Sequence, residues 1–234
     1  MKRIDLHAHT HYSNCGRDLP EDLIKEMINN RIDVLGITDH NYGIGVREKE
    51  YRTAIKSLAE KYRDKITILC GIELCTMQEN KLNSNSDLSE YDYCLVENLG
   101  SVDSVMKDDI VEYTSQFKCI KGIAHTDLFG FIAKNKLNPY EYLSSLRRAG
   151  IFWELNVNYD SIHGYREHNY VKTFFSNQEQ QDIVKKVGLY VAVGFDGHRK
   201  EDYCVSRVEM ANEFLEKNNI LNAVDLIMAN KRNN

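Results

Sequence analysis

The 234-residue sequence contains only two prolines and no apolar run long enough to cross a membrane. A membrane-spanning helix needs about 18 or more consecutive apolar residues. Met1, Lys2 and Arg3 are also not followed by the apolar core of a signal peptide. The scarcity of proline suits long helices and few rigid loops. These absences lead us to expect a cytoplasmic protein without a membrane partner.

The chain has neither paired cysteines nor an excess of positive charge. Its six cysteines, Cys15, Cys70, Cys75, Cys94, Cys119 and Cys204, form no Cys-x-x-Cys pair, so in a reducing compartment most should be free thiols. The net charge is −5 and the isoelectric point is about 5.9. A general nucleic-acid binder usually has a basic surface. Nucleic acid is therefore not an expected partner, although a few local arginines or lysines can still hold an anionic substrate.

Strand-like and helix-like segments alternate along the chain. The hydrophobic content of 42% is enough for a sizeable core, and a single α/β barrel of this length is ordinary. The expected strands are 3–7, 33–38, 66–72, 91–96, 119–124, 151–157 and 189–195. The expected helices are 20–28, 47–63, 103–116, 139–149, 177–187 and a helical tail over 203–229, with loops at 78–89 and 158–170. Such alternation predicts a parallel sheet, either closed into a barrel or open and doubly wound.

Two histidines lie two residues apart at the end of the first expected strand, in Ile4-Asp5-Leu6-His7-Ala8-His9. Residues i and i+2 of a strand point to the same face, so His7 and His9 present two imidazoles side by side. A metal ion is the commonest reason for such a pair, and an affinity tag would be a longer run of consecutive histidines. Taken alone, this stretch favours a metal site and a chance occurrence about equally.

Metal-binding residue types recur where other expected strands end. Five of the eight histidines and three carboxylates occupy such positions: His7, His9, Asp39, His40, Glu73, His125, Asp196 and His198. In a barrel the carboxyl ends of all strands meet at one rim, whereas in an open sheet ligands gather at one switch point. Closing the sheet would bring all of these side chains together. The constellation therefore predicts a barrel and a metal site at the same time.

The types and number of these donors indicate more than one metal ion. Imidazole and carboxylate ligands suit Zn, Mn or Fe and disfavour an all-oxygen Mg or Ca site. A tetrahedral zinc uses only four ligands, so we expect two to three divalent ions, with Glu73 bridging a pair. Metal ions about 3.5–4 Å apart activate a water as hydroxide and neutralise the charge that develops on a phosphate. The expected reaction is therefore the hydrolysis of a phosphoester.

In their order along the chain, these motifs resemble those of the PHP (polymerase and histidinol phosphatase) family. The matching segments are His-x-His in the first strand, Thr38-Asp39-His40, Gly71-Ile72-Glu73, Ala124-His125, Glu154-Leu155-Asn156 and Gly194-Phe195-Asp196-Gly197-His198. The resemblance covers nearly the whole chain. It implies a single domain over residues 1–234, built as an α/β fold of the distorted (β/α)7 TIM-like barrel type with a trinuclear metal centre. Family members include histidinol-phosphatases, nucleotide phosphoesterases and polymerase-associated nuclease domains.

Carried over position by position, the resemblance implies three groups of ligands, with Glu73 bridging from the first ion to the second. The groups are His7, His9 and Asp196 for one ion, Glu73 and His125 for a second, and His40 and His198 for a third.

The sequence departs from the family pattern at two positions. Where many members have Asp or His two residues after the serine of the first loop, this chain has Cys15, with Asp18 a little further on. Either Cys15 is a thiolate ligand, or Asp18 reaches the metal, or Cys15 is an unrelated loop thiol. After the fourth strand, where members usually carry His, Glu97 is the expected substitute ligand. The other reading of that position is a second ion with one ligand fewer.

Further residues are expected to support the chemistry. Glu73, Asp196 and Asn156 are the expected catalytic residues, and Asn156 is included because alternation with Glu154 places it inside the rim. Asp39 is expected to orient a ligand imidazole.

Three arginines are the expected substrate-binding residues, because arginine matches the geometry of phosphate with two donors: Arg166, Arg199 and Arg17. Arg166 shares a long loop with His163 and His168. An exposed loop with incidental charges is an equal reading of that segment.

The leading hypothesis is a metal-dependent phosphoric ester hydrolase. It would act on a small histidinol-phosphate-like or nucleotide-like phosphomonoester through a metal-activated hydroxide. The alternative is a non-catalytic or regulatory metal-binding barrel, motivated by the departures at Cys15 and Glu97. A hydrolase of amide substrates on a related barrel would carry a carboxylated lysine at a strand end, and no lysine fits that position.

Overall fold

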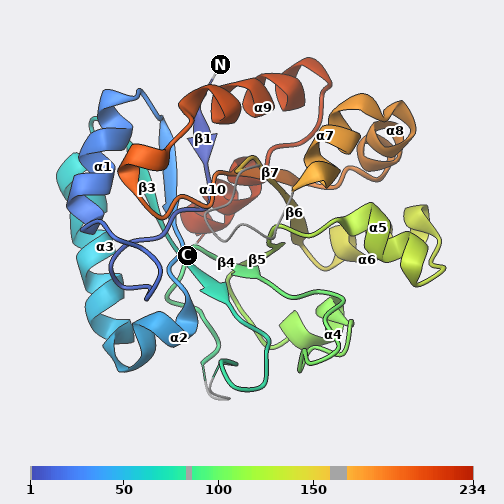
Figure 1. Cartoon of the computed structure of the whole chain (residues 1–234), viewed down its shortest axis with the longest axis horizontal. Helices are drawn as coiled ribbons and strands as arrows, with labels where there is room; N and C mark the ends of the chain where they lie inside the picture. Colours follow the sequence, from blue (N-terminus) through green and yellow to red (C-terminus); the bar gives the residue numbers. More distant parts are fainter. Residues whose placement is uncertain (1, 83–85, 159–167, 234) are drawn as a thin grey trace.

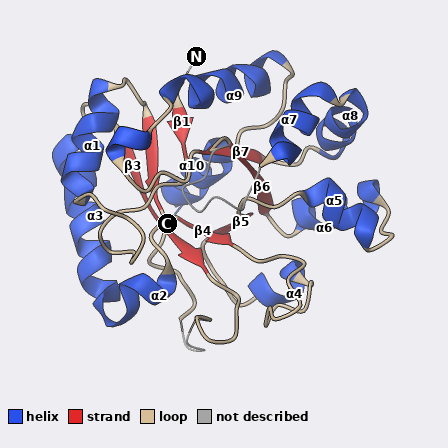
Figure 2. Ribbon diagram, in the orientation of Figure 1, coloured by secondary structure: helices blue, strands red, loops and turns tan. Residues whose placement is uncertain are grey.

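A sheet of parallel strands in sequence order forms the centre of the molecule, drawn in red in Figure 2. The computed structural model describes residues 2–82, 86–158 and 168–233. The strands are β1 Ile4–Asp5, β2 Val34–Ile37, β3 Thr67–Leu74, β4 Tyr93–Val96, β5 Ile120–Ile123, β6 Ile151–Asn156 and β7 Val191–Gly194. Each strand pairs in parallel with the next one in the chain. The seven expected strands are therefore all present.

The first and last strands meet and nearly close the sheet into a barrel. The amide of Leu6 donates to the carbonyl of Val193 at 2.9 Å, and the amide of Asp196 donates to the carbonyl of His7 at 2.7 Å. A further bridge joins Ala8 to Gly197, beyond the ends of both strands. These bonds bring the segments after β1 and β7 side by side. The predicted (β/α)7 barrel is confirmed.

Helices surround the barrel on its outside, as Figure 1 shows. The longer ones are α1 Pro20–Asn29, α3 Glu48–Tyr62, α6 Pro139–Arg148, α8 Gln178–Val187, α9 Val205–Lys217 and α10 Ala223–Asn233. Shorter ones are α2 Asn41–Ile44, α4 Ile110–Thr114, α5 Leu128–Lys134 and α7 Asn169–Ser176, with 3-10 turns η1 Gly45–Arg47 and η2 Lys200–Asp202. None of the helices in the described residues is long and apolar enough to cross a membrane.

Alternation of side chains along the strands produces two apolar clusters. In β6, Phe152 points into the barrel and joins a small cluster with Leu6 and Tyr93, whereas Trp153 points outward into the larger cluster beneath the helices. Ala223 and Ile227 of α10 belong to the inner cluster. Helix α10 therefore covers the end of the barrel at which the strands begin, and the opposite end is left for polar side chains.

Two expected helices differ in extent from the structure. The segment 103–116 is helical only over α4, because Ser104 is bound elsewhere: its hydroxyl lies 2.7 Å from that of Thr76. Lys107 and Asp108 also have positive φ angles of 51° and 63°, which a helix does not allow. The tail expected over 203–229 divides into α9 and α10, and Asn219 between them has φ 54°.

Three helices were not expected from the sequence: the single turn α2, and the longer α5 and α7. Helix α5 is capped by Asp127, whose carboxylate accepts from the amide of Gly130 at 2.8 Å. Gly130 lies inside this helix and weakens its sequence signal. Helix α7 begins at Asn169, inside the stretch 158–170 that was expected to be a loop.

Candidate metal centre

The side chains predicted from the strand ends meet at the rim of the barrel opposite α10. Their donor atoms form three groups, and the atoms of each group lie within 4.8 Å of one another. The groups are His7, His9 and Asp196; Glu73, Glu97 and His125; and His9, Cys15, His40 and His198. All of these side chains are buried except those of Cys15 and His125, which are half-buried.

The first group has short spacings between its donor atoms. Nε2 of His7 lies 3.1 Å from Nε2 of His9. Oδ1 of Asp196 is 3.0 Å from Nε2 of His9 and 3.5 Å from Nε2 of His7. A tetrahedral zinc with bonds of about 2.0–2.1 Å has ligands about 3.3–3.4 Å apart. The donors of this group therefore fit a single divalent ion.

Glu73 lies between all three groups. Its Oε2 is 3.3 Å from Nε2 of both His7 and His9, and 3.0 Å from Nδ1 of His40. Its Oε1 is 2.9 Å from Nε2 of His125, which is also 3.9 Å from Oε2 of Glu97. One carboxylate with oxygens facing different sets of imidazoles has the geometry of a bridging ligand. Glu97 lies where a further ligand beside His125 was expected.

Glu154 fixes the orientation of two imidazole-bearing residues. Its Oε1 lies 2.7 Å from Nδ1 of His7, and its Oε2 accepts from the amide of His125 at 2.6 Å. An ionised carboxylate only accepts hydrogen bonds, so Nδ1 of His7 carries a proton and Nε2 is the ring nitrogen that faces the centre. Gly194 makes this possible, because a Cβ there would collide with Glu154.

Asp39 supports the centre through Ser13. The two oxygens of Asp39 accept from Thr10 and Ser13, with the Ser13 hydroxyl at 2.6 Å. Oγ of Ser13 in turn lies 3.2 Å from Nδ1 of His9 and accepts from the amide of His40 at 2.9 Å. Asp39 thus orients the imidazole of His9 indirectly, through Ser13.

The buried carboxylates of the centre require positive charge close to them. Burial favours the neutral acid of Glu73, but His40 and His7 outweigh it and hold its pKa well below the usual range. Burial also opposes the charged form of His7, and Glu154 and Glu73 outweigh it and raise the pKa of His7 well above its usual value. Burial lowers the pKa of His9 to about 3, so this imidazole is neutral and available as a ligand. Divalent cations would supply the charge that these buried carboxylates require.

Cys15 and Asp18, the two alternatives for the first loop, have different surroundings. Cys15 belongs to the group of His9, His40 and His198. Burial raises the pKa of the Cys15 thiol, but hydrogen bonds from His198 and His40 outweigh it and lower that pKa to about 7. Asp18 accepts instead from the amide of Lys200 at 2.8 Å and is absent from all three donor groups.

The remaining predicted residues are less closely associated with the donor groups. Asn156 is buried, and its side-chain amide lies 3.4 Å from Oδ2 of Asp196. Arg17 and Arg199 are exposed and flank His198, whose carbonyl accepts from the amide of Arg17 at 3.0 Å. Arg166 and His163 lie outside the described residues.

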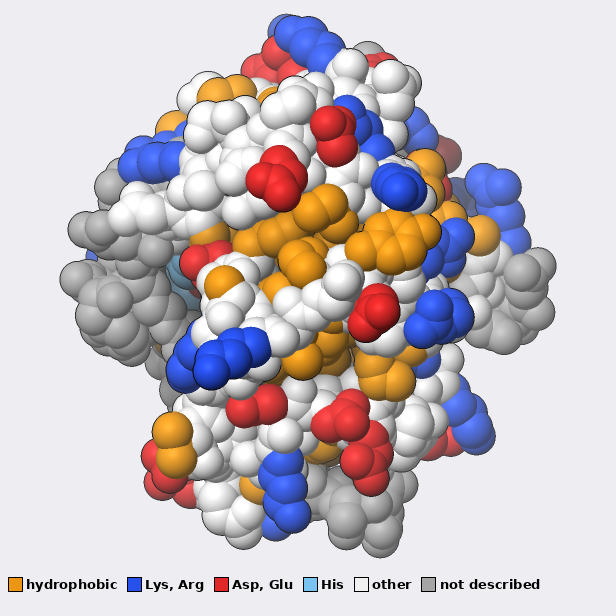
Figure 3. All heavy atoms as spheres, turned by 90° about the vertical axis from the view of Figure 1, so that its right-hand side faces the viewer, with side chains coloured by type: hydrophobic (Ala, Val, Ile, Leu, Met, Phe, Trp, Pro, Cys, Tyr) orange, Lys and Arg blue, Asp and Glu red, His pale blue; other side chains and the backbone are white. Residues whose placement is uncertain are grey.

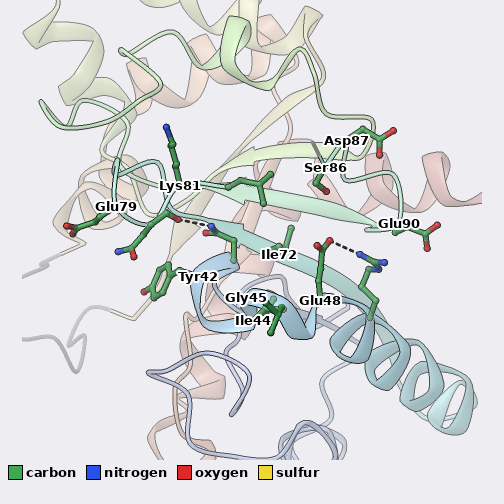
Figure 4. Close-up of a pocket in the computed structure, with 15 residues that line it drawn as sticks. Tyr42, Ile44, Gly45, Glu48, Ile72, Glu79, Lys81, Ser86, Asp87 and Glu90 are labelled. Carbon is green, nitrogen blue, oxygen red and sulfur yellow. Dashed lines mark hydrogen bonds and ion pairs between the residues drawn. The ribbon is translucent and has the colours of Figure 1, made fainter. Parts of the chain in front are cut away.

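One cavity adjoins the centre, and a second has none of the donor side chains in its walls. One of about 520 Å³ extends from His125 and is lined by His168, Lys134 and Phe131, among others. His168, for which an exposed loop was only one of two equal readings, is buried, with its ring 6.0 Å from that of His125. The other cavity, of about 860 Å³, lies beside Tyr42 and has more acidic than basic side chains in its walls (Figure 4).

Sequence reasoning missed the roles of Glu154 and Ser13. Glu154 had a usable signal, because it lies two residues before Asn156 on the face that points into the barrel. Ser13 lies in an irregular segment without a periodic pattern, and only the folded chain brings it to the rim.

Comparison with known proteins gives consistent matches. A family model described as "PHP domain" matches residues 5–181. The histidinol-phosphatase of Lactococcus lactis subsp. lactis (strain IL1403) is 25% identical over 113 residues, which are 44% of this chain and 42% of that protein. The aligned region therefore spans less than half of the curated relative.

Solved structures match over a larger part of the chain. The histidinol phosphate phosphatase from Lactococcus lactis subsp. lactis Il1403, complexed with Zn, L-histidinol and phosphate, is 18% identical, with a TM-score of 0.66 over 93% of this chain and 94% of that one. A chain of an archaeal ribonuclease P with mature tRNA is 16% identical, with a TM-score of 0.50 over 92% of this chain and 90% of that one. At these identities the likeness establishes the fold.

Proposed function

Because the chain belongs to the PHP domain family, we propose that it is a metal-dependent phosphoesterase acting on a small phosphomonoester. Histidinol phosphate is the first substrate to test, since histidinol-phosphatases are among its similar proteins. The observation that carries the proposal is the meeting of three groups of buried donor side chains at one rim, with Glu73 in contact with each group. Such a centre suits a reaction in which negative charge develops on phosphate oxygens.

We assign two to three divalent ions, of Zn, Mn or Fe, to this centre. The proposed ligands are His7, His9, Asp196, Glu73, His125, Glu97, His40 and His198. When bound, such ions provide an activated water and neutralise charge on the phosphate. Glu73 and Asp196 would then act as catalytic residues by holding the ions at fixed positions. Asn156 would assist Asp196, because its side-chain amide is directed at that carboxylate.

The substrate would enter from the side of His125. The cavity there contains one lysine, Lys134, and the buried ring of His168 next to apolar Phe131. A leaving group of a few carbon atoms would fit this mixed lining. Among the residues that the structure describes, Arg17 and Arg199 are the candidates for binding the phosphate at the open side of the rim, because both flank His198. Arg166 remains a prediction for the same role.

The expected absence of a nucleic-acid partner stays a prediction. On the face that carries α5 to α8, lysines and arginines are interspersed with acids around a central group of hydrophobic side chains (Figure 3). A mixture of both signs lacks the single-sign basic stripe of many nucleic-acid binders. The likeness to a ribonuclease P chain makes an RNA oligonucleotide a necessary member of the test panel. The cytoplasmic location and the single-domain organisation also stay predictions.

Phosphate release tests the proposal. The protein is stripped of metal, reloaded with zinc or manganese, and assayed with p-nitrophenyl phosphate, histidinol phosphate, nucleotides and an RNA oligonucleotide. We expect hydrolysis of a small phosphomonoester, and we expect His7→Ala to lose more than the roughly 10–100-fold typical of changes to a metal's supporting residues. His11→Ala is the matched control, because His11 is exposed and belongs to none of the donor groups.

Two results would contradict the proposal. The first is no phosphate release from any small ester by the metal-loaded protein, which would favour the non-catalytic barrel. The second is equal activity of His7→Ala and the unaltered protein. Cleavage confined to RNA would replace the small substrate by a nucleic acid.

A further inference from the structure

The third group of donors includes a sulfur atom that sets it apart from the other two. Sγ of Cys15 lies within 4.8 Å of a ring nitrogen of His40 and of His198. The first and second groups contain only imidazoles and carboxylates. The difference matters because thiolate ligands favour zinc-like soft ions, whereas carboxylates accept harder ones such as manganese.

The loop that carries Cys15 is held firmly against the rim. Ser13 is anchored to Asp39 by its amide and its hydroxyl, at 3.0 and 2.6 Å. The amide of Arg17 donates to the carbonyl of His198 at 3.0 Å. Gly16, between them, packs so closely on the backbone of Thr10 that a Cβ would collide with it. Cys15 therefore faces His198 because bonds on both sides of it fix the course of the loop.

Asp18, the alternative ligand in this loop, is used for that anchoring. Its carboxylate accepts from the amide of Lys200 at 2.8 Å, and its carbonyl accepts from the amide of His11 at 2.8 Å. The first bond ties the loop to the segment after β7, and Asp18 belongs to none of the three donor groups. Asp18 is a positioning residue for Cys15 and His198.

His9 lies close to Cys15, but both of its ring nitrogens already face other partners. Its Nε2 faces Asp196 at 3.0 Å and its Nδ1 lies 3.2 Å from the hydroxyl of Ser13. His40 differs from His9. Its Nδ1 is buried and makes no hydrogen bond of normal geometry. Oε2 of Glu73 lies 3.0 Å from this nitrogen. A buried ring nitrogen in this condition needs a further interaction, and a metal ion can provide it. The donors left for the third position are Cys15, His40 and His198.

We propose that Cys15, His40 and His198 form a thiolate-containing metal position that selects zinc over manganese, beside positions built from imidazoles and carboxylates. The inference rests on the metal centre of the proposed function. Binding breaks the S–H bond of Cys15, releases its proton to solvent and forms a sulfur–metal bond, with no change of oxidation state. The protein then carries one sulfur-bound ion whose identity is decided by Cys15 rather than by metal supply alone.

Cobalt(II) absorption tests this directly, because a cobalt–thiolate bond gives an intense charge-transfer band in the near ultraviolet. The metal-free protein is titrated with cobalt, and bound cobalt is counted by elemental analysis. We expect the band in the unaltered protein and its loss in Cys15→Ser. Cys204→Ser is the matched control and keeps the band, since Cys204 is also half-buried but lies on the segment before α9 and in none of the donor groups.

A second measurement needs no variant and so survives misfolding of Cys15→Ser. Thiol labelling followed by peptide mapping should show Cys15 reacting in the metal-free protein and protected after zinc is added.

In Cys15→Asp we expect the preference for zinc over manganese to fall by about 10–100-fold, the range typical of altered metal surroundings.

The outcomes separate this inference from the proposed function. Cobalt bound without the band, or Cys15 labelled equally with and without zinc, overturns the thiolate position while leaving the rest of the centre intact. No bound cobalt at all overturns the centre itself. Absence of phosphatase activity affects neither the band nor the labelling.

Discussion

Glu154 shows how one buried side chain can determine the state of a metal ligand. It holds the proton of His7 on Nδ1 and also accepts from the backbone of His125. Replacing it by glutamine keeps the shape but removes the charge that favours this tautomer. We expect Glu154→Gln to weaken metal binding or lower activity by about 10–100-fold, with a small change in thermal stability. Competition against a chelator of known affinity measures the first effect, and phosphate release measures the second.

Glu141→Gln serves as the control for Glu154→Gln, because Glu141 is an exposed acid on α6, outside the barrel. Unchanged metal affinity and unchanged activity in Glu154→Gln would mean that His7 needs no fixed tautomer. A large fall in melting temperature without a loss of affinity would assign Glu154 a purely structural role.

Residues at strand ends could be predicted because a parallel barrel brings those ends to one rim. His7, His125 and Asp196 follow from this rule, whatever the details of the loops. The choice between Cys15 and Asp18 could not be made from the sequence, because it depends on the bond from Lys200, which is 182 residues from Asp18. The role of Glu154 could not be predicted from its motif, because its contact with His7 forms only in the folded barrel.

Helices α1 and α3 are joined by the half-buried carboxylate of Glu21, whose charge is stabilised by the fold. Lys61 and Tyr62 of α3 donate to the same oxygen of Glu21, at 2.8 and 2.7 Å. These hydrogen bonds lower the pKa of Glu21 from 4.5 to about 2. A depressed pKa contributes stability that is present above 4.5 and lost as the pH falls from 4.5 to about 2.

We therefore expect Glu21→Gln to be slightly less stable than the unaltered protein at pH 7, and equally stable near pH 2. The melting temperatures of the two proteins, measured from pH 7 to pH 2, should converge across that lower range. Taking the difference between them removes the titration of groups that both share. Glu216→Gln on α9 serves as the control. A difference that stays constant with pH would show that the Glu21 charge is not stabilised by α3.

The predictability of the elements follows the strength of their local signals. Helix α6 has strong local signals, because Asn138 caps it and Pro139 occupies its first turn. Helix α5 was missed because Gly130 interrupts its pattern. The segment 103–109 has helical composition, but the contacts of Ser104 and Val105 with Thr76 override it. Tertiary contacts such as these cannot be seen in a window of neighbouring residues.

At the scale of the whole molecule, closure of the barrel is the least local feature. It depends on bonds between Leu6 and Val193 and between His7 and Asp196, from opposite ends of the sheet. The alternation of strands and helices was equally compatible with an open sheet. Only the placement of ligand-type residues at many strand ends favoured the barrel, so the fold was inferred from the site rather than the site from the fold.

The metal centre should therefore contribute to the stability of the whole barrel. Its donors come from the ends of β1, β3, β5 and β7 and from the loops between strands, so bound ions would link elements that are distant in the chain. A ligand that binds only the folded state at a hundred times its dissociation constant stabilises it by about 2.7 kcal/mol. For a protein of this size that corresponds to a rise of about 5–10 °C in melting temperature.

We expect dialysis against a chelator to lower the melting temperature by about this amount, and zinc to restore it. Differential scanning calorimetry on metal-free and reloaded protein measures both changes. His11→Ala should respond as the unaltered protein does, because His11 is exposed and outside the donor groups. His7→Ala should gain less from zinc, because it lacks a proposed ligand from the end of β1. If chelator and zinc leave the melting temperature of the unaltered protein unchanged, the buried donors at the rim are stable without an ion and the coupling of the centre to the barrel is absent.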